Sequence, residues 1–520
     1  MFFSIFFPLA AILLTASLVA LARRILQLPG RHLPLPPGPR ARWFGTVKLP
    51  KEYQWLTYAR WKDVYGDLIY VRVLGNPILV LNTAEAVTDL FEKRSARYSS
   101  RPTRSMVTEL MGWDWLFSTM PYGPTWRKHR ACFQQHFNVN ALGGFKPIIL
   151  REAHTLLHNL IMDDSALFHH VRRSAAAIVM MLSYGHQIAP EGDLYVTIAD
   201  KALAGLAQAG IFGTYLVDYL SCLKYIPAWF PGAAFQRQAF EWRHMNRMMR
   251  DLPFEKVKRE MTAGKAVPCF VTEQLDRLFT AASKAASEPA LEGEDLVKNV
   301  AAIAYAAGAD TTVSAILSFF LAVQVWPEVQ TKAQRQIDAV VGPDRLPSFD
   351  DREDLPAIDC IVWECLRWNP VTPLGLARHV GEDDEYRGYR IPKGTTIVPN
   401  VWAILHDEKM YPEPLRFNPD RFADEEQNAA LGINDLPNAA FGFGRRMCPG
   451  RALAFETIWI TIVTTLAVFN ISKAKDEHGN IIEPDIQFTP TLLSHPRPFC
   501  CVIALRSEKA RSLVMQTLDR

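Results

Sequence analysis

The sequence of 520 residues has few cysteines and almost no excess of charge of either sign. Its eight cysteines include no C-x-x-C pair and none of the spacings of a zinc site, so we expect neither a disulfide framework nor a structural zinc centre. The bulk of the chain is therefore expected in a reducing compartment. The net charge is +3, from 57 Lys and Arg against 54 Asp and Glu, and this excludes the general positive field of a nucleic-acid-binding protein.

Apolar sequence, in contrast, is plentiful. Apolar residues make up 49% of the chain and charged residues 21%, below the usual charged share of about 25%. This composition excludes a disordered protein. At this length folding buries about three quarters of the surface of the unfolded chain, so the core is large enough to enclose a cofactor.

The N-terminal segment has no charge between Phe2 and Ala22 and no acidic residue before Glu52. As a helix it would span about 31 Å, which matches the hydrocarbon core of a membrane. A cleaved signal peptide is the alternative, but its apolar stretch would be shorter and a small-residue cleavage site would follow it. Because Arg23 and Arg24 follow directly, we expect residues 1–22 to form one uncleaved transmembrane anchor, with the remaining chain on the cytosolic side.

Two further segments define the organisation of the chain. Residues 23–42 are basic and rich in proline, which predicts a stiff, non-helical hinge. The run Val300–Val325 is apolar enough to resemble a second span, but it carries Asp310, and a charge inside a membrane is costly. We expect this run to be a long helix in the core of one globular body, residues 43–520, because no repeat, low-complexity tract or second linker divides it.

Most of this body is expected to be helical. Two β-rich runs flank Gly75-Asn76 within residues 67–82, which predicts a hairpin. Helical patterns dominate from there to about residue 370. Shorter β-prone pieces follow at Tyr389–Ile391, Thr395–Val398 and Cys500–Leu505. The sequence therefore predicts a mainly α fold with a small β-sheet subdomain.

One cysteine lies in a recognisable pattern. Residues 441–450, FGFGRRMCPG, fit F-x-x-G-x-R-x-C-x-G at each fixed position, with Phe441, Arg446 and Cys448 as its side-chain members. Its glycines allow the backbone to turn tightly around the sulfur. A helical pattern begins just after Pro449, so Cys448 is expected at a helix N-terminus, where the metal-binding thiolate is favoured. A lone cysteine is usually a small buried hydrophobe, and we apply that interpretation to the other seven.

This loop resembles the haem-binding loop of the cytochrome P450 superfamily, and the anchor and hinge are similar to those of its microsomal, eukaryotic branch. The resemblance implies a cytochrome P450 fold for residues 43–520 and a haem b whose iron is ligated by the Cys448 thiolate. It also places Phe441 and Arg446 among the cofactor-binding residues. Electron donation from such a thiolate favours cleavage of the oxygen–oxygen bond.

The second mark of the family is E-x-x-R, supplied by Glu364 and Arg367. Glu413–Arg416 and Glu508–Arg511 match it as well, so the order of the motifs decides between them. Glu364 comes 84 residues before Cys448, with the P-x-R-F element Pro419–Phe422 between them. The resemblance implies that Glu364, Arg367 and Arg421 form a buried structural triad that locks the core around the cysteine loop.

The third mark is AGADTT at residues 307–312. Glycine weakens a helix interior and adjacent threonines can bend it, so a simple kink is one interpretation. A kink does not explain Asp310, however, because an acidic side chain is costly to bury in an otherwise apolar stretch. The resemblance implies that Thr311 holds dioxygen and ordered water and that Asp310 relays protons, which makes these two the expected catalytic residues. They favour an oxygenase over family members that rearrange peroxides.

The fourth mark is W-x-x-x-R, with Trp126 and Arg130 on one helix face. Both side chains donate hydrogen bonds, and the resemblance implies that they hold a haem propionate together with Arg446. Arg378 resembles another propionate contact, although the adjacent His379 could play that part instead. The intervening residues 127–129 are expected to form a solvated helix face or a basic surface that docks an acidic redox partner.

The resemblance thus implies a monooxygenase that inserts one oxygen atom from O2 into a lipophilic small molecule. Because no flavin or nicotinamide domain is visible, electrons are expected from a separate NADPH-cytochrome P450 reductase at the endoplasmic reticulum membrane. A terpenoid, steroid or polyketide of secondary metabolism is the expected substrate class. The walls of the substrate site are predicted at Ser105–Tyr122, Leu206–Phe235, Ala301–Ala306, Val371–Leu376 and Thr491–Leu493.

Several alternatives stay open at this point. The segment Tyr225–Pro231 either dips into the bilayer to collect substrate or belongs to the core. A reductase-independent isomerase or dehydratase would use the same fold, and a haem-binding sensor or carrier would turn over nothing. If Cys448 were merely buried, the purified protein would be colourless.

Overall fold

The computed structural model describes residues 33–40, 47, 49–211, 213–285, 290–431 and 436–517. The predicted anchor at residues 1–22 lies outside this part of the chain. Within it, α11 (Ala290–Val325) and α16 (Arg451–Val468) are long and apolar enough to cross a membrane. Their most apolar windows are 83% and 72% buried inside the protein, so both are core helices, as predicted for Val300–Val325.

The described chain is mainly helical, with three small sheets, as the sequence predicts. The other helices are α2 (Gln54–Tyr65), α3 (Ala84–Thr88), α4 (Ser95–Tyr98), α5 (Pro124–His136), α6 (Leu142–Met162), α7 (Leu167–Tyr184), α8 (Leu194–Ala209), α9 (Ala234–Thr262), α10 (Phe270–Ala285), α12 (Pro327–Val340), α13 (Pro356–Trp368), α14 (Val401–Leu405), α15 (Glu425–Leu431) and α17 (Glu508–Gln516). The strands are β1 (Leu68–Val73), β2 (Asn76–Leu81), β3 (Arg378–His379), β4 (Asp384–Tyr386), β5 (Tyr389–Ile391), β6 (Thr396–Pro399), β7 (Phe469–Lys473) and β8 (Cys501–Leu505).

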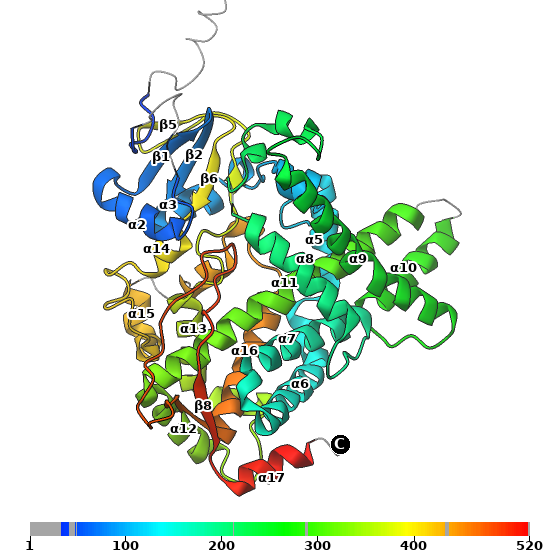
Figure 1. Cartoon of the computed structure of the whole chain (residues 1–520), viewed down its shortest axis with the longest axis vertical. Coiled ribbons are helices and arrows are strands. Elements are labelled where there is room, and N and C mark those ends of the chain that lie inside the picture. Colours follow the sequence, from blue (N-terminus) through cyan, green and yellow to red (C-terminus); the bar gives the residue numbers. More distant parts are fainter. Residues whose placement is uncertain are drawn as a thin grey trace, which may run out of the picture.

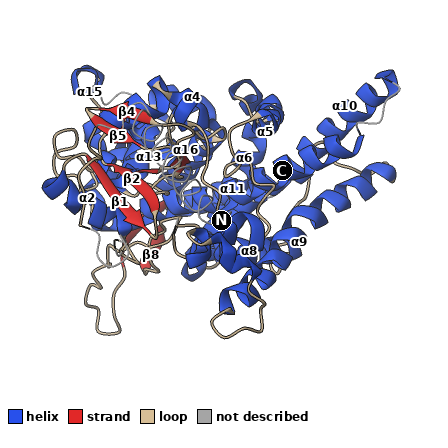
Figure 2. Ribbon diagram, turned by 90° about the horizontal axis from the view of Figure 1, so that it is seen from above, coloured by secondary structure: helices blue, strands red, loops and turns tan. Residues whose placement is uncertain are grey.

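The largest sheet has the strand order β1-β2-β6-β3 and lies to one side of the helices (Figure 1, Figure 2). The predicted hairpin is confirmed: β1 and β2 pair antiparallel, and the turn between them places Leu74 and Gly75 at positive φ. Strand β6 joins β2 in parallel from far along the chain. Because one apolar cluster covers each face, β2 reads as the continuous apolar run Ile-Leu-Val-Leu rather than as an alternating pattern.

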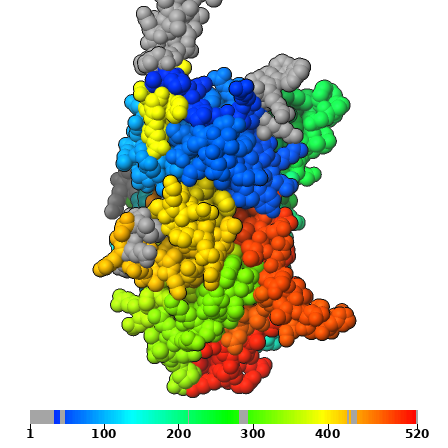
Figure 3. Space-filling model, turned by 90° about the vertical axis from the view of Figure 1, so that its left-hand side faces the viewer, coloured from blue at the N-terminus to red at the C-terminus, as the bar shows by residue number. Residues whose placement is uncertain are grey.

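The part of the predicted hinge that the structure describes is non-helical and is bound to these sheets. The Tyr70 N–H donates to the Pro37 carbonyl at 2.8 Å, and the Arg390 N–H donates to the Pro34 carbonyl at 2.9 Å. Residues 34–37 therefore lie against β1 and β5. In the space-filling view, the N-terminal sheet and the C-terminal segment occupy opposite ends of the molecule (Figure 3).

Helix α11 forms the centre of the helical part, with α7 and α16 packed against it (Figure 1). Nearly every residue from Val297 to Gln324 is buried, which explains why this segment is apolar on all sides. At Gly308 an added Cβ would lie 2.7 Å from a methyl carbon of Val179. The glycine in the AGADTT motif therefore lets α7 approach α11 closely, and the helix continues through the motif without a break.

Between β7 and β8, the chain packs against this core at residues 489–495. Ser494 is the buried anchor: its Oγ donates to Asn369 Oδ1 at 3.0 Å, and its carbonyl accepts the Ser314 hydroxyl at 2.5 Å. Its N–H donates to the Val371 carbonyl at 2.8 Å. These bonds fix residues 489–495 against α11 and the end of α13, which determines one wall of the site.

Candidate functional site

The loop around Cys448 is closed by its own backbone. The Cys448 N–H donates to the Phe441 carbonyl at 2.8 Å, and the Met447 N–H donates to the Gly444 carbonyl at 3.0 Å. Gly444 has φ +51°, and a Cβ there would lie 2.4 Å from the Phe91 carbonyl oxygen. Glycine is therefore required at this position. As predicted, a helix begins just beyond the loop, at Arg451.

Cys448 is half-buried and forms no disulfide. Burial raises the pKa of its thiol, while a hydrogen bond from the Gly450 amide and the charges of Arg130 and Arg451 act in the opposite direction. A metal ion at the sulfur would remove the thiol proton outright. The surrounding donors and cations would then stabilise the thiolate.

Trp126 and Arg130 share one face of α5 and both lie at this loop. The Arg130 guanidinium donates to the Met447 carbonyl at 2.7 Å. The Trp126 ring lies 4.3 Å from the guanidinium carbon of Arg446. The motifs around residues 126 and 446 therefore meet in space.

The expectation for the three residues between Trp126 and Arg130 is wrong in one respect. Arg127 and Lys128 are exposed, but His129 is buried. His129 belongs to the inward stripe of α5 with Trp126 and Phe133, at the i, i+3, i+7 spacing of a helix face. Only two of the three residues can form a basic surface.

Three buried arginines cluster beside the loop. Arg446 donates to the carbonyls of Ser99, Phe117 and Met120, at 2.8, 3.2 and 2.7 Å. Arg378 donates to the Phe443 carbonyl at 2.5 Å and lies over the Phe91 ring, 3.9 Å from its centre.

The third member of the cluster, Arg101, was missed by the sequence analysis. It donates to the carbonyls of Ser118, Leu376 and Ala377. No short motif surrounds it, because these partners come from two distant parts of the chain. The neighbouring residues 99–105, Ser-Ser-Arg-Pro-Thr-Arg-Ser, are mostly polar, so the local sequence does not mark Arg101 as buried.

This cluster has an unusual charge balance. In the described residues, none of the three arginines forms an ion pair with a carboxylate. Burial and the neighbouring arginines lower the pKa of Arg101 to about 9, that of Arg378 to about 9 and that of Arg446 to about 8. Buried cations are normally paired, so the cluster requires an anionic ligand. The two propionates of a haem meet this requirement.

Arg378 and His379 occupy different environments. Arg378 is buried among the arginines and aromatic rings, whereas His379 is half-buried and its N–H donates to the Ser100 carbonyl at 3.0 Å. Successive side chains of a strand point to opposite faces, so only one of the two can face the cluster. The structure places Arg378 there.

The expected catalytic residues lie on adjacent sides of α11. The Thr311 hydroxyl donates to the Ala307 carbonyl at 2.7 Å. Ala307 is exposed and Thr311 half-exposed in a helix that is otherwise buried, so open space adjoins this face. Asp310 is buried and accepts a hydrogen bond from Arg172 at 2.9 Å. A haem held by Cys448 and the arginine cluster would also need open space, and the face of α11 at Ala307 and Thr311 offers such space.

The predicted structural triad is confirmed. Arg367 is fully buried and donates twice to Glu364, at 2.7 and 2.8 Å. The Arg421 Nε donates to the same carboxylate at 3.2 Å. Asp420, which lies inside the P-x-R-F element, is exposed and pairs with Lys332, so it takes no part in the triad.

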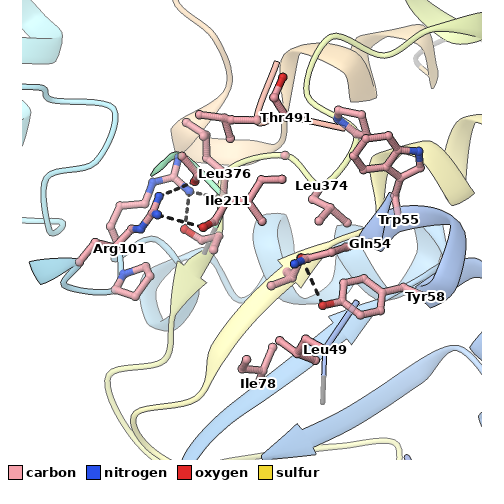
Figure 4. A pocket seen from close by; sticks show the side chains of 18 of the residues that line it. Leu49, Gln54, Trp55, Tyr58, Ile78, Arg101, Ile211, Leu374, Leu376 and Thr491 are labelled. Atoms are coloured by element: carbon pink, nitrogen blue, oxygen red, sulfur yellow. Dashed lines mark hydrogen bonds between the residues drawn. The ribbon is translucent and has the colours of Figure 1, made fainter. Parts of the chain in front are cut away.

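A cavity lies between the large sheet and the loops beside the arginine cluster (Figure 4). Its lining residues come from well-separated parts of the chain, between Leu49 and Leu492, and most of them are apolar. Of the predicted substrate walls, those around residues 119, 210–211, 373–376 and 491–492 contribute, whereas Ala301–Ala306 do not. Trp55, Tyr58 and Arg101 also line it and were not predicted. The cavity suits a largely apolar molecule.

Comparison with known proteins agrees with the motif pattern. A family model described as cytochrome P450 matches residues 35–500. The chain is 39% identical over 513 residues to a cytochrome P450 monooxygenase of Armillaria gallica, which covers 98% of this chain and 99% of the relative. It is 42% identical over 497 residues to one of Postia placenta, with 94% of each chain covered. A third, from Coprinopsis cinerea, is 39% identical over 489 residues, with 93% of this chain and 91% of the relative covered.

Proposed function

We propose that this chain, which belongs to the cytochrome P450 family and is a haem-thiolate monooxygenase, oxidises a lipophilic small molecule at the endoplasmic reticulum membrane. The single observation that carries the assignment to this site is the cluster of buried arginines without carboxylate partners beside Cys448. A thiolate donor and several buried cations are the chemistry that a porphyrin with two carboxylates requires.

The proposed ligand is haem b. Cys448 would bind its iron, and Trp126, Arg130, Arg378, Arg446 and the newly found Arg101 would bind its propionates. Phe441 would hold the ligand loop through its carbonyl, which accepts the Cys448 N–H. When bound, the cofactor supplies the oxygen chemistry, while the protein supplies binding, orientation and exclusion of water.

Two side chains on α11 would move and hold protons. The Thr311 hydroxyl borders the open face of the helix, where its oxygen can accept a hydrogen bond from an ordered water while its proton is donated to the Ala307 carbonyl. Asp310 connects this face with Arg172, whose side chain is 38% exposed and reaches solvent. Protons would therefore arrive from outside through the Asp310 carboxylate.

The proposed substrate is apolar, such as a terpenoid, steroid or polyketide of secondary metabolism. The apolar lining of the cavity supports this class. A route from the bilayer is supported by exposed apolar side chains between α8 and α9. Tyr225 and Trp229 are each 79% exposed, and Leu216 and Phe230 are exposed beside them. Such a patch on a soluble surface would be unfavourable, and it fits the membrane interface.

The proposed electron donor is a membrane-bound NADPH-cytochrome P450 reductase. The exposed Arg127 and Lys128 on α5 lie on the same helix as the propionate-binding side chains. A basic surface at this position would attract an acidic redox partner. The N-terminal segment, residues 1–22, would keep both proteins on one membrane.

The test is expression of the full chain in microsomes with and without such a reductase, followed by a screen of lipophilic compounds. We expect oxygenated products only when NADPH, reductase and O2 are all present. Conversion that proceeds without NADPH would overturn the monooxygenase proposal in favour of an isomerase or dehydratase. Haem binding without any conversion across the screened classes would contradict the proposed substrate class.

A further inference from the structure

The carboxylate of Asp310 is held from two sides. Its Oδ1 accepts a hydrogen bond from Arg172 of α7 at 2.9 Å. Its Oδ2 lies 3.4 Å from the Nε2 of His495, which comes from the C-terminal chain. The two partners thus come from segments that are far apart in the sequence. Neither oxygen is free to turn toward the Thr311 side without leaving one partner.

These contacts determine the charge of the group. Burial alone would raise the pKa of Asp310, but the hydrogen bond and charge of His495 and those of Arg172 lower it below its ordinary value. Asp200 on α8 is also close enough to interact with Asp310, and Arg172 and His169 of α7 are the other charged groups that act on Asp200. Asp200 lies 3.7 Å from Arg172, so part of the charge of Arg172 is shared. His495 is therefore the partner committed to Asp310 alone.

The surroundings of the two partners differ. The Arg172 side chain is 38% exposed, whereas that of His495 is 16% exposed. The Nδ1 of His495 is buried and, within the described residues, has no hydrogen-bond partner. Among the described residues, the imidazole ring of His495 thus has one polar contact, the one to Asp310. If this imidazole were buried for packing alone, we would not expect its one partnered nitrogen to face a buried carboxylate.

The position of His495 is fixed by a compact turn. Its N–H donates to the Thr489 Oγ1 at 3.0 Å, and its carbonyl accepts the Thr489 N–H at 2.8 Å. The Thr491 hydroxyl closes the same turn by donating to the Leu493 carbonyl at 2.6 Å. The adjacent Ser494 is anchored to Asn369 and Ser314, so the turn is held as one unit against α11.

The same turn forms part of the cavity wall. Thr491 and Leu492 line the cavity, and His495 follows them at the opposite end of the turn (Figure 4 labels Thr491). A displacement of Leu492 by a bound molecule would therefore be transmitted to the imidazole.

We propose that His495 is a positioning residue that keeps Asp310 ionised and oriented for proton delivery and links this orientation to the cavity wall at Thr491 and Leu492. The inference rests on the proposed monooxygenase function. It assigns no chemical step to His495 itself. Without His495, the Oδ2 atom would lose its partner and the carboxylate would be held by Arg172 alone.

The test uses the full-length holoenzyme with four changes: His495→Leu, His495→Gln, Asp310→Asn and the matched control His478→Leu, at an exposed histidine of a C-terminal turn. Difference infrared spectra over a pH series follow the carboxylic-acid band of Asp310, identified by its loss in Asp310→Asn. We expect the midpoint to rise by about one pH unit in His495→Leu, because an opposite charge near a carboxyl lowers its pKa by this order. His478→Leu should leave the midpoint unchanged.

Rescue by the conservative variant separates positioning from packing. Gln places an N–H donor where His Nε2 lies, so His495→Gln should keep much of the wild-type yield of product per NADPH. In His495→Leu this yield should fall severalfold, with peroxide formed in place of product. Equal midpoints in wild type and His495→Leu, with normal spectra in both, would overturn the inference. A wild-type protein without a thiolate CO spectrum would instead overturn the proposed function, so the two failures are distinguishable.

Discussion

The guanidinium carbon of Arg446 lies 4.3 Å from the centre of the Trp126 ring. This contact joins the cysteine loop to α5 and stacks a buried cation on an aromatic face, which offsets part of the cost of its burial. It does not replace a carboxylate, since the pKa of Arg446 falls to about 8 through burial and the nearby Arg101. The pair is therefore arranged for a further, anionic partner.

Removal of Arg446 should reduce haem retention. In Arg446→Leu, a charge-assisted hydrogen bond to a propionate would be lost, which corresponds to about a tenfold weaker hold on the cofactor. The ratio of Soret to protein absorbance after dialysis measures this. The adjacent Arg445 is exposed and serves as the control, so Arg445→Leu should keep the wild-type ratio. Equal loss in both variants would contradict the role given to Arg446.

Glu364→Gln should strongly destabilise the fold. The carboxylate is fully buried and neutralises Arg367 and Arg421, so its loss leaves two buried cations without a counter-charge. The expected cost in the free energy of unfolding is roughly 3–5 kcal/mol, measured by urea denaturation. Glu508→Gln tests the same E-x-x-R pattern at the exposed start of α17 and should change the free energy by less than about 0.5 kcal/mol. Similar effects at both sites would show that the triad is not the structural element.

Asp384 should make stability depend on pH. Burial would raise the pKa of Asp384, but hydrogen bonds from Tyr98 at 2.8 Å and Arg94 at 3.0 Å lower it below its ordinary value. A carboxyl with a lowered folded-state pKa stabilises the fold at neutral pH and loses this contribution as the pH falls through about 4 and below. Asp384→Asn should therefore cost about 2 kcal/mol at pH 7, and the difference from wild type should shrink in acid. A difference that grows toward low pH would refute this assignment.

Arg104 and Asp218 should hold together the chain segments beside the cavity. It donates to three consecutive carbonyls at the end of α8, those of Ala209, Gly210 and Ile211, and lies 3.6 Å from the buried Asp218. The Oδ1 of Asp218 also accepts the Met106 N–H, so two segments beside the cavity are joined here.

In Asp218→Asn, amide hydrogen exchange over residues 209–219 should become about tenfold faster, the equivalent of one weakened charged hydrogen bond. Asp114→Asn, which removes an exposed ion pair with Arg247, is the matched control. Unchanged exchange in Asp218→Asn would show that this contact does not hold the segments together.

The site residues that could be predicted from the sequence are those marked by other residues a few positions away. Trp126 and Arg130 share a helix face because of their i, i+4 separation, and Cys448 is marked by glycines that only a tight loop requires. Order along the chain was enough to select Glu364 over Glu413 and Glu508. These features are local, so no knowledge of the fold was needed.

Arg101 and His495 could not be predicted in this way. Arg101 is defined by carbonyls at residues 118 and 376–377, and His495 by a carboxylate on α11, so both roles arise only when distant segments pack. The choice between Arg378 and His379 depends on which face of β3 meets the core. His129 was misplaced because the width of the buried stripe on α5 depends on the helices packed against it.

The most direct test of the account is the reduced-CO difference spectrum of the full-length protein, compared between wild type, Cys448→Ala and Cys132→Ala. Cys132 is a buried cysteine on α5 and controls for general damage to the core. We predict the thiolate-type Soret band in wild type and Cys132→Ala and its complete absence in Cys448→Ala. A thiolate band that survives in Cys448→Ala, or a wild-type spectrum typical of a nitrogen ligand, would contradict the central claim.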